Sequence, residues 1–218
     1  MHLQKFRIIL AAGIVLLVQG SPVLCQEDES LKLPSPQTDI GKPLMQVLKD
    51  RKTSREFSTD KLPDQMLSNL LWAAFGVNRP ESGKRTAPSA VNWQEIDIYV
   101  AMADGLYLYD AKAHQLKLIL SEDIRALTGV QAFVKAVPVN LIYVADFSKM
   151  GNADDSQKEF YSSADTGFIG QNVYLFCASE GLATVVRGLI DRPGLAKAMG
   201  LAINQRIILA QSVGYPKK

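Results

Sequence analysis

The feature that most restricts the fold is a helical pattern of about 25 residues from Ser156 to Glu180. It contains no proline, and most of its second half, GFIGQNVYLFCA, is apolar. A helix that is apolar around most of its circumference has to be buried. Gly167 and Gly170 would let another helix approach closely. We therefore expect this helix in the core of a domain or in a dimer interface.

Strand patterns on both sides of this helix predict an α+β fold. The segment PVNLIYVADF, residues 138–147, is almost continuously apolar, as expected of a strand buried on both faces. Further strands are expected at 95–102, 106–110, 115–120 and 206–216, and further helices at 43–50, 60–78, 121–127, 130–136 and 192–200, with a loop at 82–94. This order predicts an α+β sandwich, in which helices flank a mainly antiparallel central sheet.

The N-terminus has the pattern of a secretory signal peptide, residues 1–25. Lys5 and Arg7 precede an uncharged run of about 11 residues, which is too short for a membrane span of about 20. Cys25 is the expected cleavage point, or alternatively a lipid acceptor, although Leu24 before it is not small. Residues 26–42 are predicted to be a polar linker or arm, and residues 43–218 the domain of an exported, periplasmic or secreted protein.

Charge and cysteine content restrict the partners. Cleavage after residue 25 would remove two of the 24 basic residues and none of the acidic ones, which leaves 22 of each sign. A neutral protein disfavours nucleic acid as a partner. Cys177 would be the one remaining cysteine, so no internal disulfide is expected. Contact with a membrane is expected only through the signal peptide or the less favoured lipid anchor.

Histidine is too scarce for several kinds of chemistry. His2 lies in the predicted signal peptide, so a zinc site built from several His and Cys ligands cannot be assembled. A Ser-His-Asp triad would have to use His114, which stands in YDAKAHQLKL and is expected to be a solvated histidine of a hairpin turn. The chain also has no G-x-S-x-G elbow, P-loop or G-x-G-x-x-G run. These absences disfavour common hydrolases, nucleoside triphosphatases and Rossmann dehydrogenases.

Four stretches together carry a resemblance to a known family. RKTSREF (51–57), RTAPSAVNWQ (85–94), DTGFIGQNVYLFCASEGLATVV (165–186) and GYP (214–216) resemble motifs of the nitroreductase family of flavoproteins, in the same order and at similar spacing. The second and third stretches and the hairpin at 105–119 most resemble the branch that includes the SagB-type dehydrogenases. The resemblance implies an FMN enzyme, usually a homodimer with two flavins at the subunit interface.

The first stretch matches the family motif R-R-S-x-R-x-F, which implies a grip on the FMN phosphate. Arg51, Lys52 and Thr53 take the first three positions and supply charge-assisted hydrogen bonds. Arg55 takes the third arginine position, for which we expect a structural ion pair. Without the resemblance, the same run is typical of a solvated helix end, where cations are favourable.

The other stretches imply contacts with the flavin ring. By resemblance, Pro88, Ser89 and Ala90 line the ring and Asn92 hydrogen-bonds it, although the segment is also typical of an ordinary loop with a turn proline. Gly181, Leu182 and Ala183 follow the end of the long helix, and their backbone amides would stabilise the reduced ring near N5 and O4. A basic residue near the chain end would complete the phosphate site; the candidates are Arg206, Lys217 and Lys218.

The resemblance implies ping-pong transfer of hydride from a reduced donor to a conjugated acceptor, such as a nitroaromatic compound or a quinone. No catalytic side chain is predicted, because the flavin N5 carries the chemistry. SagB-type azoline dehydrogenases use a Lys-Tyr pair, and this chain contains no adjacent Lys-Tyr. The alternative from another class is an FMN-binding module without turnover, or a flavin-free interaction protein of the same fold.

Overall fold

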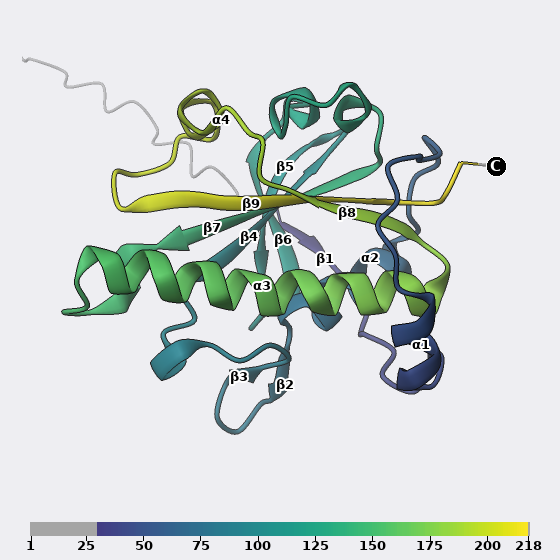
Figure 1. Cartoon of the computed structure of the whole chain (residues 1–218), viewed down its shortest axis with the longest axis horizontal. Helices are drawn as coiled ribbons and strands as arrows, with labels where there is room; N and C mark the ends of the chain where they lie inside the picture. Colours follow the sequence, from purple (N-terminus) through teal and green to yellow (C-terminus); the bar gives the residue numbers. More distant parts are fainter. Residues whose placement is uncertain (1–29, 218) are drawn as a thin grey trace, which may run out of the picture.

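A seven-stranded antiparallel sheet forms the centre of the computed structural model, which describes residues 30–217 (Figure 1). The strand order is β1-β6-β5-β4-β7-β9-β8, and β2 and β3 form a separate two-stranded ribbon. The strands are β1 Ser30–Lys32, β2 Val77–Arg79, β3 Lys84–Arg85, β4 Ile96–Met102, β5 Gly105–Asp110, β6 Gln115–Leu120, β7 Val139–Asp146, β8 Ala183–Arg187 and β9 Gln205–Gly214. The helices are α1 Leu44–Asp50, α2 Asp64–Phe75, α3 Asp155–Glu180 and α4 Arg192–Met199, with 3-10 turns at Ala90–Asn92, Arg125–Leu127, Ala132–Lys135 and Phe147–Met150.

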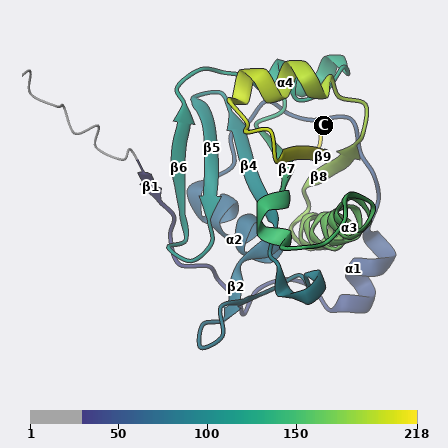
Figure 2. The same cartoon turned by 90° about the vertical axis from the view of Figure 1, so that its left-hand side faces the viewer.

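Two hydrophobic cores lie on the two faces of the sheet, which confirms the predicted α+β sandwich. Helices α2 and α3 cover one face, and α4 with 3-10 turns covers the other (Figure 2). Strand β7 serves both cores, since Leu141 and Tyr143 belong to the first and Ile142 and Val144 to the second. This double burial is the reason for the unbroken apolar pattern of β7.

Helix α3 lies along the sheet and ends beside β8. Its first turn is closed by a capping box between Asp154 and Gln157. A Cβ at Gly170 would lie 3.5 Å from Val186 Cγ2 of β8, whereas a Cβ at Gly167 would meet nothing within 4 Å. Within the described chain, Gly170 faces the sheet instead of another helix and Gly167 meets open space. The alternative of a dimer interface at this helix stays a prediction.

Some predicted boundaries were too wide. The helix expected at 60–78 begins only after Pro63 and ends at Phe75, because the chain turns at Gly76 into ribbon strand β2. The loop expected at 82–94 contains β3 and a 3-10 turn. The short helices expected at 121–127 and 130–136 are single 3-10 turns, which are too short to bury an amphipathic face.

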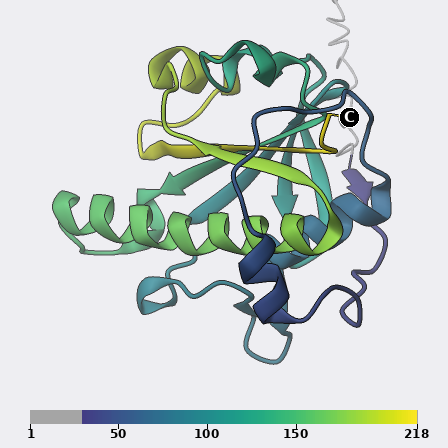
Figure 3. The same cartoon turned by 45° about the vertical axis from the view of Figure 1, so that its right-hand side comes forward.

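The segment predicted as a linker or arm is described from Ser30 onward. It adds edge strand β1 to β6 and then runs past α2 to α1 (Figure 3). Gln37 N–H donates to Asn69 Oδ1 at 2.8 Å, and Ser68 Oγ donates to the Pro34 carbonyl at 2.5 Å. The predicted signal peptide, Cys25 and the terminal Lys218 lie outside the described residues.

His114 also holds the arm, so the expectation of a solvated turn histidine was wrong. Its backbone adopts φ +49°, and its half-buried ring joins Ser68 Oγ through Nε2 at 2.7 Å and Tyr109 OH through Nδ1 at 3.0 Å. Burial lowers the pKa of His114, because the charged ring would lose water. The residue is thus a cross-link between helix, hairpin and arm.

Candidate functional site

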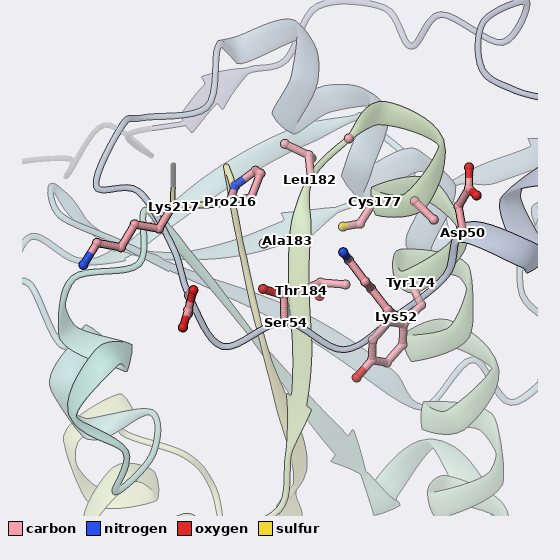
Figure 4. Close-up of a pocket in the computed structure, with 13 residues that line it drawn as sticks. Asp50, Lys52, Ser54, Tyr174, Cys177, Leu182, Ala183, Thr184, Pro216 and Lys217 are labelled. Carbon is pink, nitrogen blue, oxygen red and sulfur yellow. The ribbon is translucent and has the colours of Figure 1, made fainter.

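The segment after α1 runs extended beside β8 and lines a pocket of about 510 Å³, here called the β8 pocket (Figure 4). Ser54 N–H donates to the Thr184 carbonyl at 3.0 Å, and Lys217 N–H donates to the Glu56 carbonyl at 3.3 Å. The pocket is lined by Asp50, Lys52, Ser54, Glu56, Tyr174, Cys177, Ala178, Gly181, Leu182, Ala183, Thr184, Pro216 and Lys217. Side chains of extended backbone alternate in direction, which is why residues 52, 54 and 56 share this wall.

Arg51 and Thr53 point instead to Tyr174 on α3. Thr53 Oγ1 lies 3.1 Å from the Tyr174 hydroxyl, which also accepts the Val186 N–H of β8 at 3.0 Å. The Arg51 guanidinium lies 5.5 Å from the centre of the Tyr174 ring, a cation-π contact. Tyr174 therefore fixes the loop against both α3 and β8. Sequence reasoning missed this role; the signal was a tyrosine within an otherwise apolar helical run.

Several cations of this segment are free to meet an anion. Among residues 30–217, Arg51, Lys52 and Arg55 have no carboxylate in ion-pair contact, so the ion pair expected for Arg55 is absent there. Asp50, which also lines the β8 pocket, accepts from Gln46 Nε2 at 2.9 Å. In Figure 4, Lys52 extends into the pocket and Lys217 points away from it.

The three residues predicted at the end of α3 all line the β8 pocket, but two of their amides are already used. Gly181 turns the chain with φ +74°, and the N–H groups of Gly181 and Leu182 both donate to the Cys177 carbonyl. The expectation of free amides at these two residues was wrong, because the helix uses them to close its last turn. Ala183 begins β8 opposite Gly214 of β9.

Cys177 adds no nucleophile to the β8 pocket. It is a free cysteine with 1% of its surface exposed. Burial raises the pKa of its thiol, so the sulfur stays protonated and unreactive.

The chain end completes the wall of the β8 pocket and extends it. A neighbouring hollow of about 780 Å³ shares Gly181, Pro216 and Lys217 with the pocket and continues along residues 57–60. Of the predicted C-terminal cations, Lys217 belongs to the wall of the pocket, although its side chain points away from it in Figure 4. Arg206 does not, because its side chain donates to the Ile203 carbonyl and lies over the Phe147 ring.

The second predicted stretch lies elsewhere in the same chain. Pro88, Ser89 and Asn92 line a separate hollow of about 220 Å³, and Ala90 N–H donates to Asp165 Oδ2 of α3 at 2.9 Å. Asp165 precedes Gly181 by 16 residues, which is about 24 Å along the helix axis. The structure thus brings the first and third stretches together but not the second.

Residues 89–94, here called the 89–94 turn, concentrate backbone strain. Val91, Asn92 and Gln94 have φ values of 52°, 57° and 50°, although none is glycine. Such angles cost free energy and persist only where surrounding contacts enforce them. Gln94 N–H donates to Ser89 Oγ at 2.8 Å, while the Val91 side chain is 79% exposed. Strain of this kind is typical of functional loops.

Two buried acids support the 89–94 turn. Glu95, just before β4, is 0% exposed, and Asp165 is 2% exposed. Ser89 Oγ donates to Glu95 Oε2 at 3.3 Å, and Ala90 N–H donates to Asp165 Oδ2 at 2.9 Å. Sequence reasoning missed both residues; the signal was an acid at the start of an apolar strand and another within the long helix.

The described residues restrict other kinds of site. Between residues 30 and 217, no cluster of three His, Cys, Asp or Glu side chains could hold a metal ion. Nor does that part of the chain contain a helix with the length and apolar character needed to cross a bilayer.

The β8 pocket has features that fit a flavin mononucleotide. Lys52 lines the pocket, and Arg51 and the hydroxyl of Thr53 stand next to it against Tyr174. Within residues 30–217 neither cation has a carboxylate partner, which leaves both available to a phosphate. Leu182, Ala183 and Pro216 supply apolar wall for a flat ring. The volume falls within the range of about 300–1,000 Å³ that is common for cofactor sites.

Comparisons with known proteins show which family this chain is similar to. Residues 48–215 match the model of the Nitroreductase family. A protein of Methanocaldococcus jannaschii named as a nitroreductase, MJ1384, is 34% identical over 155 residues, which cover 66% of this chain and 78% of that protein.

Solved structures show the same fold. A crystal structure of a protein from Ralstonia eutropha JMP134, described as a nitroreductase, superposes with a TM-score of 0.83 at 43% identity, covering 87% of this chain and 90% of the other. The NADPH:FMN oxidoreductase of Vibrio harveyi, complexed with NAD+, superposes with a TM-score of 0.60 at 17% identity, covering 80% and 69%.

Proposed function

The chain belongs to the nitroreductase family, and on this premise we propose that it is an FMN-dependent oxidoreductase. It would pass hydride or electrons by a ping-pong mechanism from a reduced donor to a conjugated acceptor, such as a nitroaromatic compound or a quinone. The single observation that carries the proposal is the β8 pocket, where unpaired cations and an apolar wall meet. Bound FMN would supply the redox chemistry at its N5 atom.

The phosphate grip would consist of Arg51, Lys52 and Thr53. The contact with Tyr174 leaves the guanidinium edge of Arg51 available, because the cation-π contact uses the face of the group. Thr53 would donate its hydroxyl while its oxygen remains near Tyr174. Lys217 is our candidate for the C-terminal cation, since it lines the same pocket.

The ring would lie against the beginning of β8. Gly181, Leu182 and Ala183 would form its wall. These residues orient the ring and exclude water from one side. We assign no catalytic side chain, because the flavin N5 would carry the chemistry.

A second copy of the chain would complete the site. Pro88, Ser89, Ala90 and Asn92 lie near the other end of α3, so a two-fold dimer could place the turn of one subunit beside the β8 pocket of its partner. Exposed apolar side chains support such an interface; they are Leu44, Met45, Val91, Phe160 and Phe168. The proposed assembly is a homodimer with FMN at its interface.

Our proposal for the localisation of the protein rests on the N-terminal sequence alone. We propose export through the predicted signal peptide, with lipidation of Cys25 as the less favoured alternative. Nicotinamide cofactors are scarce outside the cytoplasm, so the proposed physiological donor is something other than free NADH. Membership of the SagB-type branch also remains a hypothesis, and without an adjacent Lys-Tyr pair it lends no support to azoline oxidation.

Purification with a visible spectrum tests the proposed function. We expect yellow protein whose flavin absorbance bleaches with a reductant and recovers with an acceptor. Stable flavin without turnover would support the alternative of a binding module, and protein that refuses added FMN would support a flavin-free interaction protein. Rapid mixing with NADH and with reduced quinols tests the donor; much faster reduction by NADH would contradict our hypothesis.

A further inference from the structure

A buried arginine at the end of β8 holds a loop against the segment that we assign to the FMN phosphate. The residue is Arg187, and the loop, here called the 125–137 loop, lies between β6 and β7 and contains two 3-10 turns. Resting on the proposed function for its purpose, we propose that Arg187 is a positioning residue for the phosphate grip, on which it acts through the contact of Phe133 with Phe57. It would not touch the flavin itself.

Hydrogen bonds from two strands fasten the 125–137 loop. Arg187 Nη1 donates to the Thr128 carbonyl at 2.6 Å, and Nη2 donates to Asn140 Oδ1 at 2.9 Å. Asn140, on β7, donates in turn from Nδ2 to the Val134 carbonyl at 2.9 Å. A Cβ at Gly129 would overlap Arg187 Nη1, so the loop passes over the guanidinium where it has no side chain. The loop is thus held at two points on the sheet.

The charge of Arg187 is balanced by neutral oxygens and not by an acid. The residue is 4% exposed, and it takes part in none of the ion pairs among residues 30–217. Its acceptors are the carbonyl and hydroxyl of Thr128 and the amide oxygen of Asn140. A buried cation is costly unless such groups surround it, and hydrogen bonds from a charged donor are strong. The guanidinium and the 125–137 loop therefore hold each other in place.

One aromatic contact joins the 125–137 loop to the phosphate segment 51–57. The centre of the Phe133 ring lies 5.5 Å from that of the Phe57 ring, with an angle of 33° between their planes. Phe57 also forms an isolated β-bridge with Pro216, which lines the β8 pocket. Phe133 itself is not part of the pocket wall. The loop therefore supports the end of the phosphate segment from outside the pocket.

Amide hydrogen exchange measures how firmly the phosphate segment is held, and it needs no flavin. Two amides report on the segment: Ser54 N–H donates to the Thr184 carbonyl at 3.0 Å, and Ser58 N–H donates to the Tyr215 carbonyl at 2.9 Å. Arg187→Met removes the guanidinium but keeps a long side chain. In flavin-free protein with this change, both amides should exchange about tenfold faster, as expected when one supporting hydrogen bond is lost. FMN affinity should also fall by about tenfold.

Two further variants test the route of the effect. Arg187→Lys keeps the charge but lacks the planar fork, so it should restore part of the slow exchange and part of the FMN affinity. Phe133→Leu leaves the hydrogen bonds of Arg187 in place and removes the ring contact with Phe57, so it should reproduce both losses even where Arg187→Met does not fold. The double variant Arg187→Met with Phe133→Leu should bind FMN no more weakly than Arg187→Met alone, because both changes break the same contact path.

Arg192→Met is the matched control. Arg192 stands at the start of α4 and also donates to backbone carbonyls, those of Ile207 at 2.9 Å and Ile208 at 2.8 Å. None of its hydrogen bonds reaches the 125–137 loop. Its loss should lower the melting temperature but leave the FMN affinity and the exchange of Ser54 and Ser58 unchanged.

The outcomes separate this inference from the proposed function. If Arg187→Met and Phe133→Leu speed the exchange of Ser54 and Ser58 but no form of the protein binds FMN, the positioning role stands and the proposed function fails. If both variants lower the melting temperature but keep the original exchange and FMN affinity, Arg187 only stabilises the fold and the inference is overturned. Losses of affinity that add up in the double variant would also overturn it, because the two residues would then act independently.

Discussion

The β8 pocket and the 89–94 turn are two halves of one predicted flavin site, but they are built differently. The pocket rests on regular elements: an extended segment, the end of α3 and strand β8, joined by backbone hydrogen bonds such as Ser54 N–H to Thr184. The turn has three non-glycine residues at positive φ and depends on buried acids from other elements. The comparison teaches that recognition of a phosphate can use ordinary backbone, whereas presenting a side chain from a tight turn requires enforced strain.

The largest effect is expected in the β8 pocket. Arg51→Ala removes the guanidinium proposed for the phosphate and should weaken FMN binding by about 2–3 kcal/mol, the range for hydrogen bonds to charged groups. Flavin fluorescence titration measures this loss. Arg55→Ala is the control, because Arg55 is a cation of the same segment that we do not assign to the phosphate, and its loss should leave the affinity nearly unchanged. If the Arg51 variant and the original protein bind FMN with equal affinity, the segment is a solvated helix end and not a phosphate site.

A smaller loss of FMN affinity is expected when the Tyr174 hydroxyl, which contacts Thr53, is removed. Tyr174→Phe keeps the ring under Arg51 but deletes the hydroxyl that joins Thr53 and Val186, so FMN affinity should fall by about 1 kcal/mol. Calorimetric FMN titration and thermal unfolding separate binding from stability. Tyr161→Phe on the same helix is the matched control. A lower melting temperature with unchanged FMN affinity would show a structural role alone.

In the 89–94 turn, removal of a side chain should raise the stability of the protein instead of lowering it. Val91→Gly relieves a β-branched residue at φ 52°, and because its side chain is exposed, the protein should gain about 1 kcal/mol of stability. In contrast, Thr53→Gly in the unstrained segment should lower stability. Chemical denaturation measures both variants. A destabilised Val91→Gly protein would show that the turn is not strained, and the comparison would lose its basis.

The smallest effect on stability is expected where His114 holds the arm, which is part of neither the β8 pocket nor the 89–94 turn. The pKa of His114 is lowered, so its contribution to stability is complete above the ordinary value of 6.5 and decreases as the pH falls through and below that value. Burial raises the pKa of Glu95 instead, so the contribution of Glu95 to stability decreases as the pH rises. His114→Asn tolerates the positive φ and should remove this part of the pH dependence. Melting temperatures between about pH 5 and pH 8 check it, and an unchanged profile would contradict the buried cross-link.

Several parts of the fold could be predicted from local pattern. The apolar run of β7, the length of α3 and the meander of β4 to β6 depend on the side-chain period of each segment and on its own turn residues. In contrast, the segment at 51–57 and the end of α3 were assigned to one site only because their motifs resemble those of the nitroreductase family.

Other features depend on residues far apart in the chain. His114 meets Ser68 across 46 positions, and Ala90 meets Asp165 across 75, so neither partner is visible in a sequence window. The amides of Gly181 and Leu182 are used up by a helix end whose geometry the sequence does not specify.

The sequence by itself determined the order of elements, the two-faced burial of β7 and the residue types available to bind a flavin, because these follow from local periodicity and composition. Only the tertiary structure decided which side chains meet. It turned Lys52 into the β8 pocket and Arg51 toward Tyr174, and it placed the 89–94 turn on the acids Glu95 and Asp165. The physical reason is that direction and burial arise from packing between distant segments, which no single segment encodes.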